Sequence, residues 1–171
     1  YSINPQNEIV LWTIRFPRII LALLVGAGLS VAGCAFQSLF SNPLATPDTL
    51  GVASGTSFGA ALGILMGFSL IGIQFSALLF GIIAVSLTYL SGTGKGHSIN
   101  TIVLAGIMIG SLFSALVSFT KFVADSESQL PAITYWLMGS LSSASYKTLM
   151  LGAPFIICLL YTSDAADDSL R

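Results

Sequence analysis

Residues that could perform acid–base, nucleophilic or metal chemistry are scarce in this chain. It holds one histidine, His97, in the polar stretch 91–98, and no other metal ligand lies near it at a suitable spacing. A zinc site needs three or four such ligands brought together. Cys34 and Cys158 lie far apart in apolar segments, which is typical of small buried hydrophobes rather than of a disulfide or metal pair. We therefore expect no metal site and no cofactor.

The segment Gly92-Thr-Gly-Lys-Gly96 has the composition of a phosphate-binding loop but not its spacing. A Walker-type loop has the form GxxxxGK[ST] and follows a buried strand, and neither condition is met. Serines are frequent in the apolar segments, but no base stands ready to activate one as a nucleophile. The chain is not expected to be an enzyme, so any energy source must lie in another polypeptide or in an ion gradient.

Two arginines form the most distinctive charged feature. Arg15 and Arg18 are three residues apart, directly before an uncharged apolar run that reaches Phe40. This spacing places both on one face of a helix. They could anchor a helix end at the membrane interface, or they could dock an acidic partner, because exposed charges steer and orient association. The residues alone leave both interpretations open.

The elements that carry these residues must lie in lipid. Hydrophobic residues make up 54% of the 171 residues and charged residues only 8%, and the mean hydropathy is +0.90. A soluble domain has about 25% charged residues, so this chain could not cover a water-facing surface. No basic patch is present that could bind nucleic acid. We predict an all-α, polytopic transmembrane helical bundle.

A helix needs about 20 apolar residues to cross a bilayer. The expected spans are residues 19–40, 50–70, 71–90, 99–119 and, beginning another span, 148–160. Residues 130–141 are apolar but too short to span, which predicts a half-helix. The tail 161–171 brings three aspartates where hydrocarbon should continue. We expect that tail to be foreign to the protein, the alternative being a cytoplasmic tail, and the polar opening at residues 1–8 suggests a missing upstream segment.

Small residues recur every four positions in two of these spans. They are Gly51, Gly55, Gly59, Gly63 and Gly67 in one, and Gly106, Gly110, Ser114 and Ser118 in the other. Residues four apart share a helix face, and small ones let two backbones approach closely. We expect helix packing here, and the lining of a substrate path is a compatible alternative.

The segment after Phe40 predicts a break in the helix. Asn42 can cap a short helix, Pro43 suits its first turn, and Pro47 cannot continue a helix above it. Asp48 would then lie close to the next helix start, where the helix dipole favours a negative charge.

These segments resemble, in their order, the FecCD family of permease subunits of bacterial ABC importers for iron–siderophore complexes, haem and cobalamin. The resemblance runs from about Leu11 to Leu160 and includes Arg15-Phe-Pro-Arg18, Gln37-Ser-Leu-Phe40, Asn42-Pro-Leu-Ala45, Leu50-Gly-Val-Ala-Ser-Gly55, Leu104-Ala-Gly-Ile107 and Tyr135-Trp-Leu-Met-Gly-Ser140. It implies the type II importer permease fold in the bacterial cytoplasmic (inner) membrane, with about five of about ten membrane helices present here. The implied partners are cytoplasmic ATPase subunits, a periplasmic or lipid-anchored substrate-binding protein and a second permease subunit in a homodimer or heterodimer.

The resemblance also implies roles for single residues. Arg15 and Arg18 would pair with acidic residues of the binding protein, and the half-helix would close the outer end of the path. The cytoplasmic gate would comprise Ser98, Asn100 and Thr101, and Gly106, Gly110 and Ser114 would line the translocation path. The positive-inside rule taken alone predicts the opposite orientation, because most cations would lie outside.

Two other interpretations stay open. A secondary transporter also uses broken helices and small-residue packing, but it would need ionisable residues within the membrane. Only Asp48, at a helix end, is available for that purpose. The chain could also be a non-functional, truncated remnant of a permease.

Overall fold

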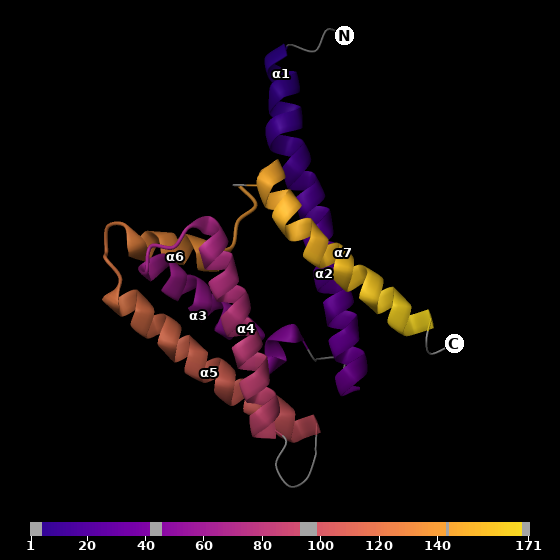
Figure 1. Ribbon diagram of the computed structural model, residues 1–171, viewed down its shortest axis with the longest axis vertical. Coiled ribbons are helices and arrows are strands. Elements are labelled where there is room, and N and C mark those ends of the chain that lie inside the picture. The colour runs from indigo at the N-terminus through magenta and orange to yellow at the C-terminus, as the bar shows by residue number, and fades with distance from the viewer. Residues whose placement is uncertain (1–4, 42–45, 93–98, 143, 169–171) are drawn as a thin grey trace. The chain divides into compact units, whose positions relative to one another are not determined.

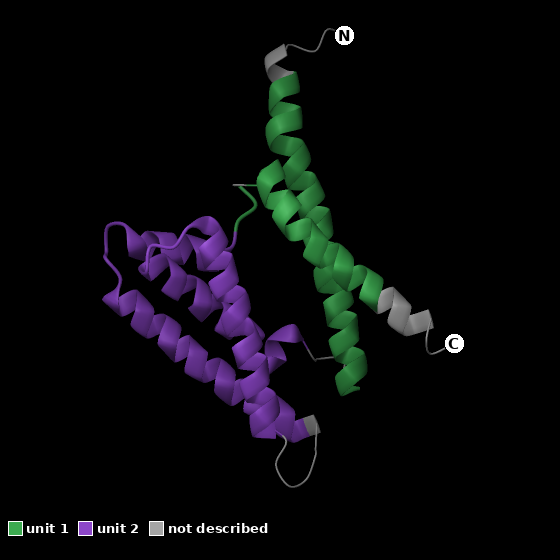
Figure 2. Ribbon diagram, viewed as in Figure 1, with its two compact units in different colours: residues 1–41, 140–171 green, residues 42–139 purple. Residues whose placement is uncertain are grey.

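The computed structural model describes residues 5–41, 46–92, 99–142 and 144–168, with only the backbone at 5–7, 99 and 163–168. Every regular element within these ranges is a helix, which confirms the all-α prediction (Figure 1). The chain divides into two compact units, Tyr1–Ser41 with Ser140–Arg171, and Asn42–Gly139 (Figure 2).

Unit 1 consists of one long helix and a second that packs on it. The long helix comprises α1 (Pro5–Val10), the π-helical turn η1 (Leu11–Arg15) and α2 (Phe16–Phe40). Its partner is α7 (Tyr146–Asp168), which crosses α2 in Figure 1. A Cβ on Gly28 of α2 would lie 3.3 Å from Cγ2 of Ile156, so a glycine permits this close crossing.

Unit 2 is built around α3 (Val52–Leu65), which packs against α4 (Leu70–Gly92) and α5 (Ile99–Val123). A short 3₁₀ helix, η2 (Pro47–Leu50), precedes α3 and contacts α5. The last element of the unit, α6 (Gln129–Met138), lies against α3. Its 10 residues span about 15 Å, about half of a bilayer core. The structure thus has a helix of this length where a half-helix is expected at residues 130–141.

Three helices in the described part of the chain are long and apolar enough to cross a membrane, namely Glu8–Phe40, Leu70–Gly92 and Asn100–Val123. The expected span at 50–70 differs, because α3 has only 14 residues and ends at Leu65. Gly51 and Gly67 have φ of 70° and 71° and bound it on either side. This left-handed conformation suits glycine and interrupts a helix. The expected range 148–160 lies within α7, which continues to Asp168.

Serine and threonine hydroxyls in the apolar helices donate hydrogen bonds to backbone carbonyls of the same helix. Within the helices, hydroxyls donate to the carbonyl four residues earlier at Ser30, Ser86, Ser111, Ser118, Thr120, Thr134 and Thr162. Such a bond satisfies the hydroxyl without a partner helix. This explains how so many serines and threonines occur in segments that face lipid.

The interior of unit 2 is formed by aromatic rings and small residues. Phe58 of α3 lies 5.0 Å from Phe80 of α4 and 5.9 Å from Phe113 of α5, measured between ring centroids. These distances fall within the preferred range for aromatic pairs. Near α6, Ala61 and Ala124 pack with the fully buried Ile133. The three rings join α3, α4 and α5 at one point.

Candidate functional site

Two glycines of α3 bring its backbone into contact with α4. A Cβ on Gly55 would lie 2.6 Å from Cβ of Ala84 and 2.8 Å from the carbonyl oxygen of Phe80. A Cβ on Gly59 would overlap the carbonyl oxygen of Ser76. The Ser76 hydroxyl donates to the Gly59 carbonyl across the two helices at 2.7 Å. The hydrogen bond and the two glycines together set the spacing of α3 and α4.

A second close approach fixes the break between η2 and α3. A Cβ on Gly51 would lie 2.9 Å from the amide nitrogen of Gly110, and one on Gly106 would overlap the carbonyl oxygen of Thr49. From α4, the buried Thr88 hydroxyl donates to the Leu50 carbonyl at 3.0 Å. We call these residues the η2–α3 joint. Backbone and side chains from three elements hold the helix break in one conformation.

The 3₁₀ helix in this joint begins where the sequence predicts an interruption. Pro47 occupies its first turn, where its missing N–H is not needed. Thr46 and Thr49 form a reciprocal capping box at its start, and the Thr46 amide donates to the Thr49 hydroxyl at 3.0 Å. The expected cap at Asn42 and first turn at Pro43 lie outside the described residues. Pro47 therefore starts a helix instead of only blocking one.

The residues expected to line a path differ in burial, since Gly106 is buried, Gly110 is half-buried and Ser114 is exposed. Gly106 is buried against η2. A Cβ added to Gly110 would lie 3.5 Å from the Cα of Gly51. The Ser114 hydroxyl is 3.2 Å from the Ser54 hydroxyl of α3 and donates to it. Among the described residues Gly106 packs α5 against η2, and the path-lining role expected of it stays a prediction. Ser114 is exposed and polar.

The other glycines of the α3 series differ in what they do. A Cβ added to Gly63 would lie 3.3 Å from the Cα of Ile73 in α4, so this glycine also permits close packing of the two helices. The prediction of helix packing is wrong for Gly67, because no atom lies within 4 Å of its Cβ position. The amides of Gly67 and Phe68 donate to the carbonyls of Ile64 and Gly63. This is the Schellman pattern, in which a left-handed glycine ends a helix.

The half-helix α6 is held in place by the loop before it. The Asp125 carboxylate accepts hydrogen bonds from the Ser128 hydroxyl at 2.7 Å and the Ser128 amide at 2.9 Å. These bonds favour the ionised form, so the pKa of Asp125 lies below its usual value of 3.8. Gln129 accepts from the Asp125 amide and donates to the Leu65 carbonyl at 3.2 Å. Gln129 thus ties the start of α6 to the end of α3, a role that its sequence position did not reveal.

Of the predicted gate residues, Asn100 and Thr101 lie in the first turn of α5 and are exposed. Ser98 lies outside the described residues, so its position relative to the other two is not part of the structure.

The two arginines of the docking prediction differ in their surroundings. Arg18 donates from Nε to the Leu141 carbonyl and from Nη2 to the Ser142 carbonyl, both at 3.1 Å. Arg15 is exposed and makes no hydrogen bond or ion pair with any residue that the structure describes. Both belong to unit 1, as do their neighbours. Of the predicted pair, the Arg18 guanidinium is hydrogen-bonded within unit 1, and the Arg15 guanidinium is not hydrogen-bonded to the described residues.

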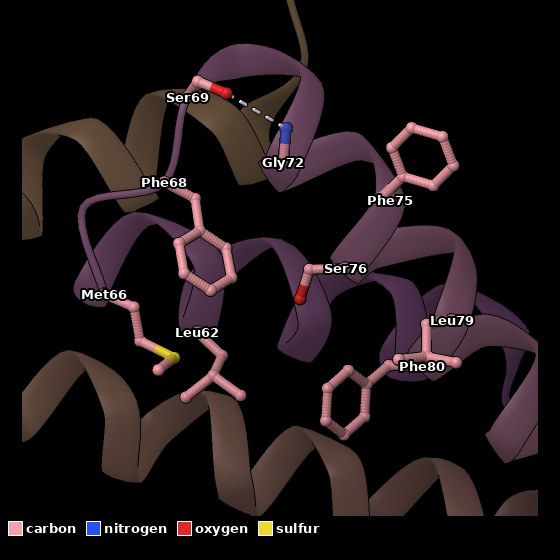
Figure 3. A pocket seen from close by; sticks show the side chains of 9 residues that line it. All are labelled: Leu62, Met66, Phe68, Ser69, Gly72, Phe75, Ser76, Leu79 and Phe80. Atoms are coloured by element: carbon pink, nitrogen blue, oxygen red, sulfur yellow. Dashed lines mark hydrogen bonds between the residues drawn. The ribbon is translucent and has the colours of Figure 1, made fainter.

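An apolar cavity of about 690 Å³ opens where α3 turns into α4 (Figure 3). Leu62, Met66 and Phe68 line one side of it, and Phe75 and Leu79 of α4 contribute to the other. Its two hydroxyls are already engaged: the Ser69 hydroxyl accepts from the Gly72 amide, and the Ser76 hydroxyl donates to Gly59. The cavity therefore offers chiefly hydrocarbon contact.

Among the residues that the structure describes, no group of side chains forms a site for acid–base or metal chemistry. No three histidine, cysteine, aspartate or glutamate side chains there gather as a metal site would require. Cys34 and Cys158 are unpaired and exposed, so their expected burial is wrong for this structure. Both lie on helices of unit 1 whose outer faces are apolar, where exposure to lipid carries no penalty for a thiol.

Comparisons with known proteins agree with this architecture. The model of the FecCD transport family matches residues 2–165, extending past Leu160. The chain is 42% identical over 159 residues to the molybdate import system permease protein MolB of Haemophilus influenzae, covering 92% of this chain and 47% of that protein. It is 36% identical to the hemin transport system permease protein HmuU of Yersinia pestis, with 92% and 50% covered.

A cobalamin import system permease protein, BtuC of Halobacterium salinarum, is 34% identical, with 92% of this chain and 42% of that protein covered. Among solved structures, an ABC transporter assigned to the metal-chelate type and captured in an inward-facing conformation matches with a TM-score of 0.83 and 40% identity. That match covers 92% of this chain and 51% of the other. The chain thus spans about half the length of the relatives that it matches.

The three membrane-length helices and these relatives identify a multi-pass protein of the bacterial inner membrane. Because the family model covers nearly the whole chain and the helical arrangement matches a solved relative, the chain belongs to the FecCD transport family.

Proposed function

We propose that this chain is part of a permease subunit of an ATP-driven importer and forms one side of its substrate translocation path. The observation that supports this most is the fold of unit 2, a broken helix (η2 and α3) fixed between α4 and α5 and followed by the half-helix α6. Non-helical backbone at membrane depth is tolerated where it lies against protein or a water-filled cavity, and transporters build their paths from such breaks.

ATP hydrolysis belongs, in this proposal, to separate cytoplasmic ATPase subunits. A second permease subunit would complete the path, and a periplasmic or lipid-anchored binding protein would deliver the ligand. Arg15 is the candidate contact for acidic residues of that binding protein, because its side chain is exposed and makes no hydrogen bond or ion pair with the described residues. Asn100 and Thr101, with Ser98, are the proposed cytoplasmic gate, and exposed Ser114 is the strongest candidate for lining the path.

The substrate class proposed is a metal complex or metal oxyanion. Iron–siderophore complexes, haem and cobalamin are the candidates implied by the family, and the likeness to a molybdate permease adds an oxyanion to them. No charged side chain lies within α3 or α4, which favours recognition by the binding protein over recognition inside the path.

The test is uptake by cells that carry the complete protein together with candidate ATPase and binding-protein subunits. Radiolabelled ferric siderophore, haemin, cobalamin and molybdate are offered separately, and uptake is compared with that of a strain whose ATPase lacks its Walker lysine. We expect uptake of one of the four that requires the intact ATPase and survives a protonophore. Uptake that a protonophore abolishes and the ATPase variant leaves unchanged would indicate a secondary transporter and overturn the proposal.

A further inference from the structure

The loop between α5 and α6 is closed by its own hydrogen bonds, which converge on Asp125. The Asp125 carboxylate accepts from the amide and the hydroxyl of Ser128 at 2.9 and 2.7 Å, and its backbone carbonyl accepts from the Leu130 amide at 2.9 Å. The Asp125 amide donates to Oε1 of Gln129 at 3.1 Å. Because three later residues bond to the same residue, the loop holds the first turn of α6 in one conformation.

One bond leaves this loop and reaches another helix. Nε2 of Gln129 donates to the Leu65 carbonyl at 3.2 Å, across 64 positions of sequence, and the bond is partly buried. Leu65 is the last residue of α3, where carbonyls lack the amide donors of a next turn. The three amides that follow α3 donate to the carbonyls of Leu62, Ile64 and Gly63. The Leu65 carbonyl is therefore left for Gln129.

The two bonds of Gln129 require a donor and an acceptor at the end of one side chain. The Asp125 amide can only donate and the Leu65 carbonyl can only accept, which fixes how the Gln129 amide is turned. A glutamate of the same length would still accept from Asp125, but it would place a second acceptor against the Leu65 carbonyl. A methionine has a similar helix propensity and would make neither bond. The two substitutions thus remove one bond and both bonds.

Apolar packing adds to this attachment near the middle of α6. Ile133 is fully buried and packs with Ala61 of α3 and with Ala124. At the other end of α6, Gly139 has no atom within 4 Å of its Cβ position. Among the described residues α6 is therefore fastened to α3 at its start and at Ile133, and the bond from Gln129 is the polar part of that attachment.

We propose that Gln129 is a positioning residue that couples α6 to α3 and keeps this part of unit 2 in place during transport. The coupling rests on the contacts above, and its part in transport rests on the proposed function. In that function the broken helix and α6 belong to one side of the translocation path. Loss of the Gln129 bonds frees the start of α6, so that ligand slips back past unit 2 and less is taken up per ATP hydrolysed.

Hydrogen exchange of the complete protein in lipid nanodiscs tests the coupling without any partner. The reporters are the Leu130 amide, which donates to the Asp125 carbonyl, and the amides of residues 132–138. Gln129→Glu and Gln129→Met should each speed their exchange about 2- to 10-fold, the range that corresponds to losing one ordinary hydrogen bond. Glu127→Gln is the matched control, because Glu127 is exposed in the same loop, and it should exchange as the wild type does. Wild-type exchange in both Gln129 variants would overturn the coupling, as would equally fast exchange in Glu127→Gln.

Uptake and ATP hydrolysis, measured together on the reconstituted importer, test the role in transport. We expect both Gln129 variants to lower the amount of ligand taken up per ATP hydrolysed by about 2- to 10-fold, while ATP hydrolysis itself changes little. A general loss of folding would lower both rates together. A parallel fall of uptake and ATP hydrolysis would therefore overturn the role in transport and leave the coupling of α6 to α3 standing. Uptake that is ATP-independent in the wild type would instead refute the proposed function.

Discussion

Substitution of Gly55 by alanine is the sharpest test of how closely α3 and α4 approach. The added Cβ would lie 2.6 Å from Cβ of Ala84 and 2.8 Å from the carbonyl oxygen of Phe80. Comfortable contacts between such atoms need about 3.5 to 4.0 Å. One of the two atoms belongs to the backbone and cannot turn aside, so the helices must move apart by about 1 Å.

Three terms decide the size of the effect. Overpacking a fitted interior costs about 1–3 kcal/mol, and the gain in helix propensity from Gly to Ala offsets about 0.5–1 kcal/mol of it. Separating the helices also stretches the 2.7 Å bond from Ser76 to Gly59, and an interhelical hydrogen bond in a membrane contributes about 0.6 kcal/mol. The free energy of unfolding should therefore fall by about 1–3 kcal/mol.

Gly110→Ala is the matched control in the same unit. Its Cβ would meet the Cα of Gly51 at 3.5 Å and the hydroxyl oxygen of Ser54 at 3.7 Å, which are ordinary contacts. This variant should be neutral or more stable by up to about 1 kcal/mol, because only the propensity gain remains. Reversible unfolding of the complete protein in mixed micelles, titrated with dodecyl sulfate, measures both. Equal stability of the two variants would refute the close approach of α3 to α4 as the reason for Gly55.

Other perturbations test the remaining parts of unit 2. Thr88→Val should remove the bond to Leu50 and destabilise the protein by about 1 kcal/mol, whereas Thr88→Ser should restore stability in the same unfolding assay. Gly67→Ala should cost about 1 kcal/mol through backbone strain alone, since no atom lies near the new Cβ, and Gly67→Asn should be milder. The lowered pKa of Asp125 means that its contribution to stability is present above about pH 3.8 and is lost as the pH falls through the lowered pKa. Limited proteolysis of the loop at pH 7 and over a series of decreasing acidic pH values should show that loss, and Asp125→Asn should show loop cleavage at pH 7 already.

The η2–α3 joint is enclosed by neighbouring backbone. Gly51 has left-handed backbone, yet it is enclosed by the Gly110 amide and the Gly106 carbonyl, at 2.9 and 3.1 Å from its Cβ position. A break held on several sides behaves as a fixed corner and not as a hinge. Gly51 is therefore not expected to act as a hinge within unit 2.

Composition and apolar length were enough to determine the class of this protein. With 8% charged residues, only lipid can cover the surface, and runs of about 20 apolar residues can satisfy their backbone only as helices. Local pattern also predicted a short helix at residues 130–141, where the structure has α6, and small residues on one helix face at Gly55, Gly59 and Gly106. Such features depend on residues near one another in sequence, so the sequence alone can display them.

Tertiary structure decided which of these residues meet and what each does. Gly67 shares the four-residue spacing of Gly55 and Gly59, but it ends α3 instead of packing, because a helix end depends on backbone conformation that periodicity cannot report. Arg15 and Arg18 look equivalent in sequence, yet only Arg18 reaches carbonyls 123 and 124 positions away. The hydrogen bond from Tyr146 to the Trp12 carbonyl joins residues 134 positions apart, and contacts across such separations exist only once the helices have packed.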